Sequence, residues 1–239
     1  GVDPVAFVDY LAVEEPDDDE AEQIGAGLSE GAKRADIALV GGETAVMPDV
    51  IKGLDIAGTC AGLAPKDGVF PGEAQPGDAI VGWPSSGIHS NGLTLARKAV
   101  TQEYDYTDPY PGEDYETVGH ALLEPTQLYT NLLTPMREHG VRAAAHITGG
   151  GWTNLERLGE FHYDIDEPFP AHDVFEFVQD LGDISDEEMH RTFNMGTGFA
   201  AALPEEDAEA VVEATEDGRI IGHVVDADEC VAVRGLELV

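Results

Sequence analysis

Residues 79–95 read AIVGWPSSGIHSNGLTL, and this stretch runs from a strand through a polar loop into a helix. Its first part, Ala79 to Trp83, is an apolar run of strand length. A loop of Ser, Gly, His and Asn follows, after which Leu93, Ala96 and Val100 recur at helical spacing. A polar loop between a strand and a helix is a common place for a binding site, so this stretch is the starting point for the fold and for function.

The same order of elements recurs elsewhere in the chain. A strand from Ala143 to Ile147 leads into the run Thr148-Gly149-Gly150-Gly151, and a helix is expected from Asn154 to Leu158. Near the N-terminus, an expected strand at Pro4 to Val13 precedes a helix that begins after a cluster of acidic residues. Strands that alternate with helices predict an α+β protein built from α/β-layered domains.

A Gly- and Pro-rich stretch separates two such domains. Residues 66–78 read KDGVFPGEAQPGD, with three Gly and two Pro. Such stretches punctuate regular structure, and a chain of 239 residues approaches the size at which a single core divides. We therefore expect a first domain at residues 1–66, a linker at 67–78 and a second domain at 79–239.

The charge of the chain excludes several classes of partner. It has 48 Asp and Glu against 12 Lys and Arg, a formal net charge of −36, with an ordinary 42% of hydrophobic residues. Duplex nucleic acid and anionic membranes are bound through Lys and Arg, so neither is expected as a partner. At ~1 M salt the Debye length falls to about 3 Å, so a salt-rich cytoplasm explains this charge, with an acidic protein of an ordinary cell as the alternative.

The remaining composition favours a cytoplasmic protein. Cys60 and Cys230 are the only cysteines, too few for a disulfide framework. No signal peptide leads the sequence, and no apolar run reaches the roughly 20 residues of a spanning helix. The first residue is Gly1, and an expected strand starts almost at once. We therefore expect this sequence to begin inside a larger protein.

Two carboxylates are candidate metal ligands. Asp9 shares one face of its expected strand with apolar residues, and Glu43 follows the pair Gly41-Gly42. A chain with so few lysines must neutralise a polyphosphate mainly through backbone amides, helix dipoles and metal ions, and Mg²⁺ prefers carboxylate oxygens. The alternatives are an inert carboxylate at a sheet margin for Asp9 and a simple turn residue for Glu43.

Three loops are candidate binding segments. The loop from Ser85 to Gly92 either binds an anion or merely connects a strand to a capped helix. Gly149 to Gly151 either lets a ligand approach the backbone or forms a tight packing corner. His146 and His89 either act on a ligand or are satisfied core histidines. Likewise, the segment containing Asn194, Gly196 and Gly198 lines a site or forms a bulge.

Four segments in one order carry a family resemblance. They are VGGETAVMP at 40–48, SSGIHSNGLTL at 85–95, HITGGG at 146–151 and RTFNMGTG at 191–198. Together they resemble phosphoribosylformylglycinamidine cyclo-ligase, the aminoimidazole ribonucleotide synthetase of purine biosynthesis. The resemblance extends over essentially the whole chain, and it implies two α+β domains of this family's type.

The resemblance also implies an activity and its residues. The family converts formylglycinamidine ribonucleotide to aminoimidazole ribonucleotide with ATP and Mg²⁺, releases ADP and phosphate, and forms a homodimer. By similarity, Asp9 and His146 are catalytic, and Asp9 and Glu43 bind the metal. The residues implied in ATP binding are Gly41, Gly42, Glu43, Thr44, Asn194 and Gly196. Those implied in substrate binding are Ser85, Ser86, Gly87, His89, Ser90, Asn91, Thr148, Gly149 and Gly150.

Two departures from the family pattern leave alternatives open. The family begins with a further segment whose glycine-rich loop and lysine help to cover ATP, so the present chain looks truncated and is expected to be inactive alone. Asp49 stands where a glycine is expected, which affects the turn there. Alternatives are another ATP-using relative, such as selenophosphate synthetase, thiamine monophosphate kinase, the hydrogenase maturation dehydratase or formylglycinamidine synthetase, and a non-catalytic nucleotide-binding or dimerising fragment.

Overall fold

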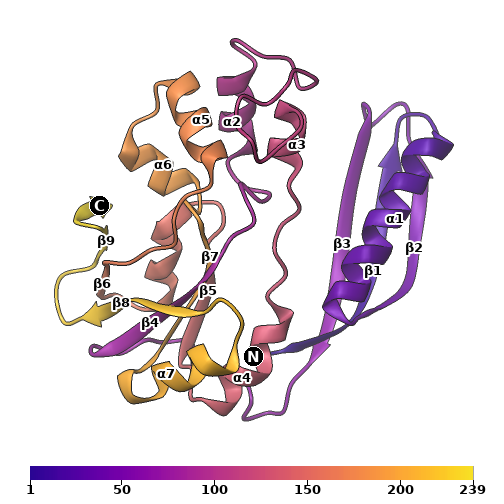
Figure 1. Ribbon diagram of the computed structural model, residues 1–239. Helices are drawn as coiled ribbons and strands as arrows, with labels where there is room; N and C mark the ends of the chain where they lie inside the picture. The colour runs from indigo at the N-terminus through magenta and orange to yellow at the C-terminus, as the bar shows by residue number, and fades with distance from the viewer. Residues whose placement is uncertain (239) are drawn as a thin grey trace. The chain divides into compact units, whose positions relative to one another are not determined.

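The computed structural model describes residues 1–238 (Figure 1). It divides into two compact units, the first formed by Gly1–Val69 with Leu128–Leu133, and the second by Phe70–Gln127 with the chain from Thr134 onward. None of the helices within residues 1–238 is both long and apolar enough to span a bilayer. In chain order the elements are β1 (Asp3–Val13), α1 (Asp18–Ala35), β2 (Ala38–Val46), β3 (Leu54–Leu63), β4 (Asp78–Pro84), α2 (Leu93–Val100), α3 (Val118–Leu123), η1 (Thr130–Leu132), α4 (Leu133–Glu138), β5 (Ala143–His146), η2 (Gly151–Leu158), β6 (His162–Ile165), α5 (Asp173–Gly182), α6 (Asp186–Thr192), β7 (Thr197–Pro204), α7 (Glu205–Ala214), β8 (Arg219–Val225), β9 (Cys230–Val233) and β10 (Leu236–Leu238).

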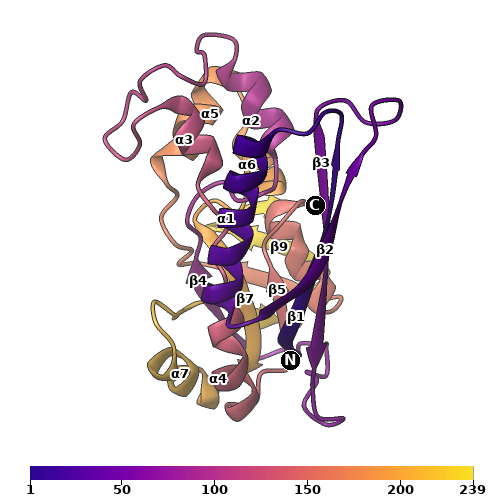
Figure 2. The same ribbon diagram turned by 90° about the vertical axis from the view of Figure 1, so that its right-hand side faces the viewer.

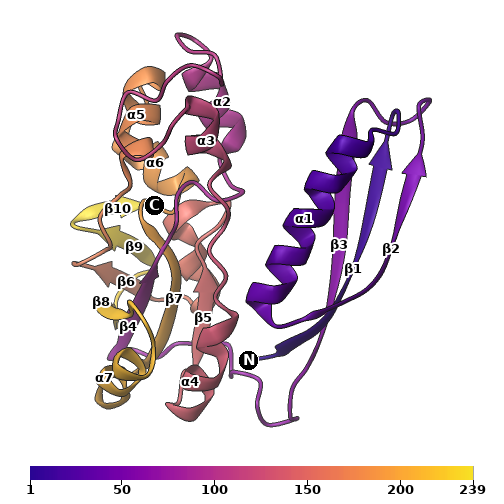
Figure 3. The same cartoon turned by 45° about the vertical axis from the view of Figure 1, so that its right-hand side comes forward.

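The first unit is a three-stranded sheet with one helix. Its strand order is β2-β1-β3, with β1 parallel to β2 and antiparallel to β3. Helix α1 lies along one face of this sheet (Figures 1 and 3). The acidic cluster starts the helix as expected, because the Asp17 side chain accepts a hydrogen bond from the Glu20 amide at 2.9 Å.

Strand β2 is longer than the sequence predicts. The expected strand ends at Val40 and turns at Gly41-Gly42, whereas the structure continues it to Val46. The pairing with β1 persists from Ala38 to Val46, apart from one register shift, so ladder hydrogen bonds outweigh the low strand propensity of glycine. Glu43 therefore lies within a strand and not in a turn. All of β3 and nearly all of β2 is exposed to solvent.

The second unit contains a seven-stranded mixed sheet. Its strand order is β10-β9-β6-β8-β4-β7-β5. Figures 1 and 2 show α2, α3 and α5 at one end of the sheet and α4 and α7 at the other. One apolar core lies between the sheet and η2, around Trp152 and Tyr163, and another lies among the helices, around Phe175 and Phe193. All four of these side chains are fully buried.

Several elements of the second unit differ from the prediction. A continuous helix is expected from Thr126 to Glu138, but regular structure starts only at Thr130 with a short 3-10 turn. The backbone before Thr130 is not helical, because the Gln127 amide donates a hydrogen bond to His89 Nε2. The expected helix at Asn154 is the 3-10 helix η2, which starts at Gly151. Strands β6 and β10 and helix α6 are not predicted from the sequence.

Candidate functional site

Three of the predicted loops converge at one end of the second sheet. Strands β4 and β5 both pair antiparallel with β7. Their C-terminal ends therefore lie at the same end of the sheet, where β7 begins. Backbone bonds join the loops there: the Ser85 amide donates to Gly196 O, and the Ile147 amide donates to Gly198 O, both at 2.9 Å. A Cβ on Gly149 would lie 3.4 Å from Asn91 Oδ1. The structure thus brings the predicted Ser85–Asn91 and Thr148–Gly150 segments together.

Asn194 ties the first loop to the start of β7. Its side chain is 3% exposed, and Nδ2 donates to Gly87 O at 2.8 Å. Its Oδ1 accepts from the Gly196 amide at 2.9 Å. Gly196 has a φ of 94°, and a Cβ there would collide with Pro170 O, so this position requires glycine. Asn194 and Gly196 therefore hold the Ser85–Asn91 loop in position against the start of β7. Contact of either residue with ATP stays a prediction.

Three histidines surround the same loop. His89 is buried, and its Nε2 accepts from the Ser86 amide at 3.1 Å, so Nδ1 carries the proton of the neutral ring. Burial, with His146 and His172 nearby, lowers the pKa of His89 to about 4. The His146 ring lies 6.0 Å from the His89 ring, and burial also lowers the pKa of His146. Both imidazoles are therefore neutral at neutral pH.

His172 is a site residue that sequence reasoning missed. Its Nε2 donates to Ser85 O at 2.8 Å and so fixes the start of the loop. In the sequence His172 follows the Pro-rich stretch before α5, and no motif distinguishes it. The hydroxyl of Ser85 is buried and makes no hydrogen bond within residues 1–238, whereas Ser86 Oγ donates to Pro125 O at 2.6 Å.

The glycine run is shaped by a buried amide. Asn154 Nδ2 donates to Gly151 O at 2.7 Å and to Gly149 O at 3.2 Å. Gly151 has a φ of 54°, and a Cβ there would collide with His190 O, which explains why this position is glycine. A cavity of about 310 Å³ lies beside the run, lined by Gly149, Thr153, Asn154, Glu156 and Arg157.

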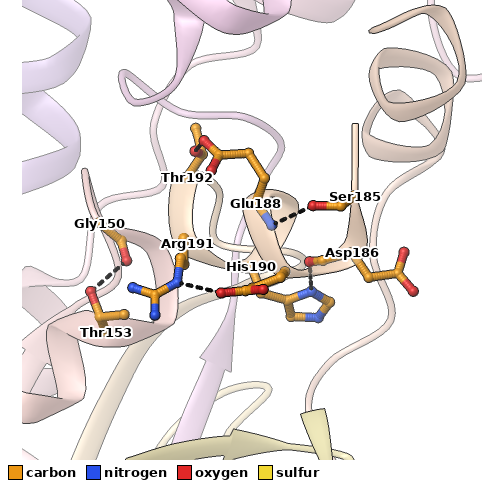
Figure 4. A network of polar contacts seen from close by, with 9 residues as sticks. Gly150, Thr153, Ser185, Asp186, Glu188, His190, Arg191 and Thr192 are labelled. Atoms are coloured by element: carbon orange, nitrogen blue, oxygen red, sulfur yellow. Dashed lines mark hydrogen bonds and ion pairs between the residues drawn. The ribbon is translucent and has the colours of Figure 1, made fainter. Parts of the chain in front are cut away.

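Two guanidinium groups lie near this run. Arg157 lines the cavity, and Figure 4 shows Arg191 of α6 beside Gly150 and Thr153. Arg191 also pairs with Glu187 at 3.2 Å, and Thr153 Oγ1 donates to Gly150 O at 2.8 Å. An anion at the glycine run would therefore meet backbone amides and the Arg157 guanidinium, with Glu156 in the same cavity lining and Arg191 partly neutralised by Glu187. Neither cation is predicted from the sequence as a site residue, although Arg191 is the first residue of the RTFNMGTG segment.

In the first unit the predicted metal ligands are separated. Asp9 pairs with Gly42 and Tyr10 with Glu43 in the register of β1 and β2, and a Cβ on Gly42 would collide with the Asp9 carboxylate. Because side chains alternate along a strand, Asp9 and Glu43 project from opposite faces of the sheet. They cannot share one ion in this arrangement. Within residues 1–238 no group of three or more acidic, His or Cys side chains forms a metal cluster.

Comparison with known proteins first defines a class. Residues 1–64 match "AIR synthase related protein, N-terminal domain", and residues 75–234 match the corresponding C-terminal domain. A solved thiamine-monophosphate kinase from Stenotrophomonas maltophilia K279a is similar with a TM-score of 0.72 and 21% identity, over 98% of this chain and 73% of that one. The hydrogenase maturation protein HypE gives the same score and identity over 97% and 73%. The fold is therefore that of AIR synthase related proteins.

Sequence relatives narrow the class to one family. The chain is 46% identical to the phosphoribosylformylglycinamidine cyclo-ligase of Methanosarcina mazei over 95% of its own length and 68% of the relative's. It is 47% identical to that of Methanopyrus kandleri, over 94% and 68%. The chain belongs to the phosphoribosylformylglycinamidine cyclo-ligase family. This confirms the resemblance carried by the four sequence segments and the predicted fold class.

Proposed function

We propose that this protein takes part in the ATP-dependent closure of formylglycinamidine ribonucleotide to aminoimidazole ribonucleotide. One observation carries the proposal: in a chain 46% identical to a cyclo-ligase, the SSGIHSNG and HITGGG loops meet at one end of the second sheet. These loops offer backbone amides, neutral histidines and two nearby guanidinium groups. They suit a substrate that carries a phosphate and loses a proton as its ring closes.

The proposed chemistry assigns separate tasks to the two loops. The formyl oxygen of the substrate is phosphorylated by ATP, the amidine nitrogen attacks the activated carbon, and phosphate leaves. The Ser85–Asn91 loop and the Thr148–Gly150 run bind the substrate, with the phosphate held by amides. His146, whose pKa is lowered by burial, is neutral and can accept the proton that the attacking nitrogen loses.

ATP and Mg²⁺ are proposed to bind along β1 and β2. A Cβ on Gly41 would meet only open space, so this backbone is accessible to a ligand. Mg²⁺ is usually held by one or two carboxylates together with substrate phosphates, so Asp9 alone is a sufficient protein ligand. Glu43, on the opposite face, would then bind a different ion or act on the nucleotide by another route.

Two further proposals concern the intact protein. Strands β1 and β2 contain no Lys or Arg, so the chain alone lacks cations there to neutralise a triphosphate, and we expect it to bind ligands without efficient turnover. A homodimer is also proposed, because the first sheet exposes large apolar side chains, namely Val8, Tyr10, Leu39, Val46, Leu54 and Ile56. Sedimentation at several protein concentrations measures this association.

Calorimetry in molar KCl tests the proposed function. We expect the chain to bind formylglycinamidine ribonucleotide, and a chain with Arg157→Gln to bind it about tenfold more weakly, because one charge-assisted hydrogen bond is lost. Thiamine monophosphate is the control ligand for the kinase alternative. Tighter binding of thiamine monophosphate would contradict the cyclo-ligase proposal. Phosphate release with Mg-ATP, compared with the Methanosarcina mazei relative, then separates a catalytic chain from a binding module.

A further inference from the structure

His89 joins two segments of the second unit, the Ser85–Asn91 loop and the run from Pro125 to Gln127. Its Nε2 accepts a hydrogen bond from the Ser86 amide at 3.1 Å and another from the Gln127 amide at 3.4 Å. The lone pair of one ring nitrogen thus serves one backbone amide from each segment. We call Pro125–Gln127 the clamp segment.

Two serine hydroxyls of the loop bind the same clamp segment. Ser86 Oγ donates to Pro125 O at 2.6 Å, so its proton is not available to the imidazole. Ser90 Oγ lies within hydrogen-bond distance of Thr126 Oγ1, at 3.2 Å. All three residues of the clamp segment are therefore bonded to the loop.

Neither ring nitrogen of His89 is placed to bind a ligand. The residue is 3% exposed, Nε2 is occupied by the two amides, and Nδ1 is buried and makes no hydrogen bond within residues 1–238. Burial, with the rings of His146 and His172 nearby, keeps the pKa of His89 low, so the neutral ring retains its acceptor at Nε2. This geometry favours support of the loop over contact with the substrate.

The loop that His89 supports keeps several backbone amides unengaged. Side chains fix its carbonyls, since His172 donates to Ser85 O and Asn194 to Gly87 O, both at 2.8 Å. The backbone amides of residues 87–91, in contrast, donate no hydrogen bond within residues 1–238. Successive amides of this kind in turns bind anions. The bonds to the clamp segment therefore hold a loop whose amides are available to a phosphate.

We propose that His89 is a positioning residue, which ties the Ser85–Asn91 loop to the clamp segment and keeps the loop amides in place for the substrate without touching the substrate itself. This inference rests on the proposed function, because it concerns the same loop. It replaces the substrate contact that the family resemblance implies for His89, and it adds the clamp segment to the candidate site.

Calorimetry with formylglycinamidine ribonucleotide in molar KCl compares two substitutions of equal length. Gln offers an acceptor oxygen to the Ser86 amide, whereas Met offers only a weakly accepting sulfur. We expect His89→Met to bind the ribonucleotide about tenfold more weakly than the wild type, the worth of one hydrogen bond. His89→Gln should restore the affinity to within about threefold. The control His120→Met, at an exposed position of α3, should bind like the wild type.

Equal affinities of His89→Met and His89→Gln overturn the proposal. If His89→Met does not fold, Thr126→Val and Thr126→Ser take the place of this pair, because only Ser keeps the hydroxyl that meets Ser90. Thr126→Val should then bind about threefold more weakly than Thr126→Ser, and equal affinities of these two variants overturn the proposal in the same way.

NMR of the ring nitrogens separates positioning from direct contact. In the ¹⁵N-histidine-labelled chain, with His89→Gln to assign the signals, Nδ1 of His89 should carry the proton at neutral pH. Both ring signals should stay in place when the ribonucleotide is saturating. A proton on Nε2, or a shift of the Nδ1 signal at saturation that indicates contact with the ligand, overturns the proposal.

Failure of the proposed function has a different signature. If the wild-type chain does not bind the ribonucleotide, the proposed function fails, and hydrogen exchange of the Ser86 and Gln127 amides then decides whether His89 positions the loop. Both amides should exchange about tenfold faster in His89→Met than in His89→Gln, because only Gln replaces the lost acceptor. Equal exchange in the two variants overturns the positioning inference.

Discussion

Removing the Asn194 side chain should destabilise the second unit by an amount that can be worked out from its contacts. Asn194→Ala leaves two buried backbone groups without partners, the carbonyl of Gly87 and the amide of Gly196, which the side-chain amide now satisfies at 2.8 and 2.9 Å. Each such group costs about 1–3 kcal/mol when unsatisfied. Water entering the vacated space recovers part of this, so we expect the free energy of unfolding to fall by about 3 kcal/mol.

Urea unfolding in molar KCl measures this loss. Trp83 and Trp152 both lie in the second unit and are buried, so tryptophan fluorescence reports on that unit alone. Asn91→Ala is the matched control, because Asn91 lies on the same loop and its side chain makes no hydrogen bond within residues 1–238. The control should change stability by less than ~0.5 kcal/mol. If Asn194→Ala unfolds at the same urea concentration as Asn91→Ala, Asn194 does not hold the loop.

Three further predictions concern charge. The melting temperature followed by circular dichroism should rise from low to molar KCl, because screening relieves the repulsion of a net charge of −36; an unchanged melting temperature would count against this account. The pKa of His89 lies at about 4 in the folded protein and near 6.5 when unfolded, so stability should be lost as pH falls through this window, by up to about 3 kcal/mol. His89→Gln, which keeps an acceptor for the Ser86 amide, should flatten that pH dependence in urea unfolding, and an equal slope in the variant would exclude His89 as its source. Asp9→Asn in the intact enzyme should lower Mg²⁺-dependent turnover far more than stability, because Asp9 is the proposed metal ligand, and wild-type turnover would remove Asp9 from the proposed nucleotide site.

Much of the fold follows from local patterns in the sequence. The period of two in β1, the acidic start of α1 and the apolar run of β4 each predict their element closely. The secondary-structure predictions are wrong where tertiary contacts outweigh the local conformational preference of the residues. Strand β2 continues through its two glycines because β1 offers a continuous ladder. Thr126 and Gln127 are not helical because they bond to the Ser85–Asn91 loop.

The candidate site was predictable in its loops but not in its supporting residues. The run Gly149 to Gly151 is conspicuous in the sequence, because three consecutive glycines are needed mainly where a backbone turns sharply or is closely approached. Asn154 and His172 hold the two loops through side-chain bonds to backbone carbonyls. Such bonds depend on which segments the topology brings together, and no spacing in the sequence encodes that. The separation of Asp9 and Glu43 likewise follows from strand register, which local patterns did not define.

Screening by salt explains how a chain with so many carboxylates can bind the proposed anionic substrate. In molar salt the Debye length is about 3 Å, so carboxylates on the far surface exert little force on a bound phosphate. Only groups in contact with the phosphate then decide affinity. Near the glycine run these groups are backbone amides, Arg157 and Arg191, opposed by the carboxylate of Glu156 in the same cavity lining. In dilute buffer the Debye length is about 10 Å or more, so the field of the same surface carboxylates extends to the bound phosphate. Substrate affinity should therefore increase with salt, opposite to the usual weakening of ion pairs, until direct competition by chloride for the amides reverses the trend.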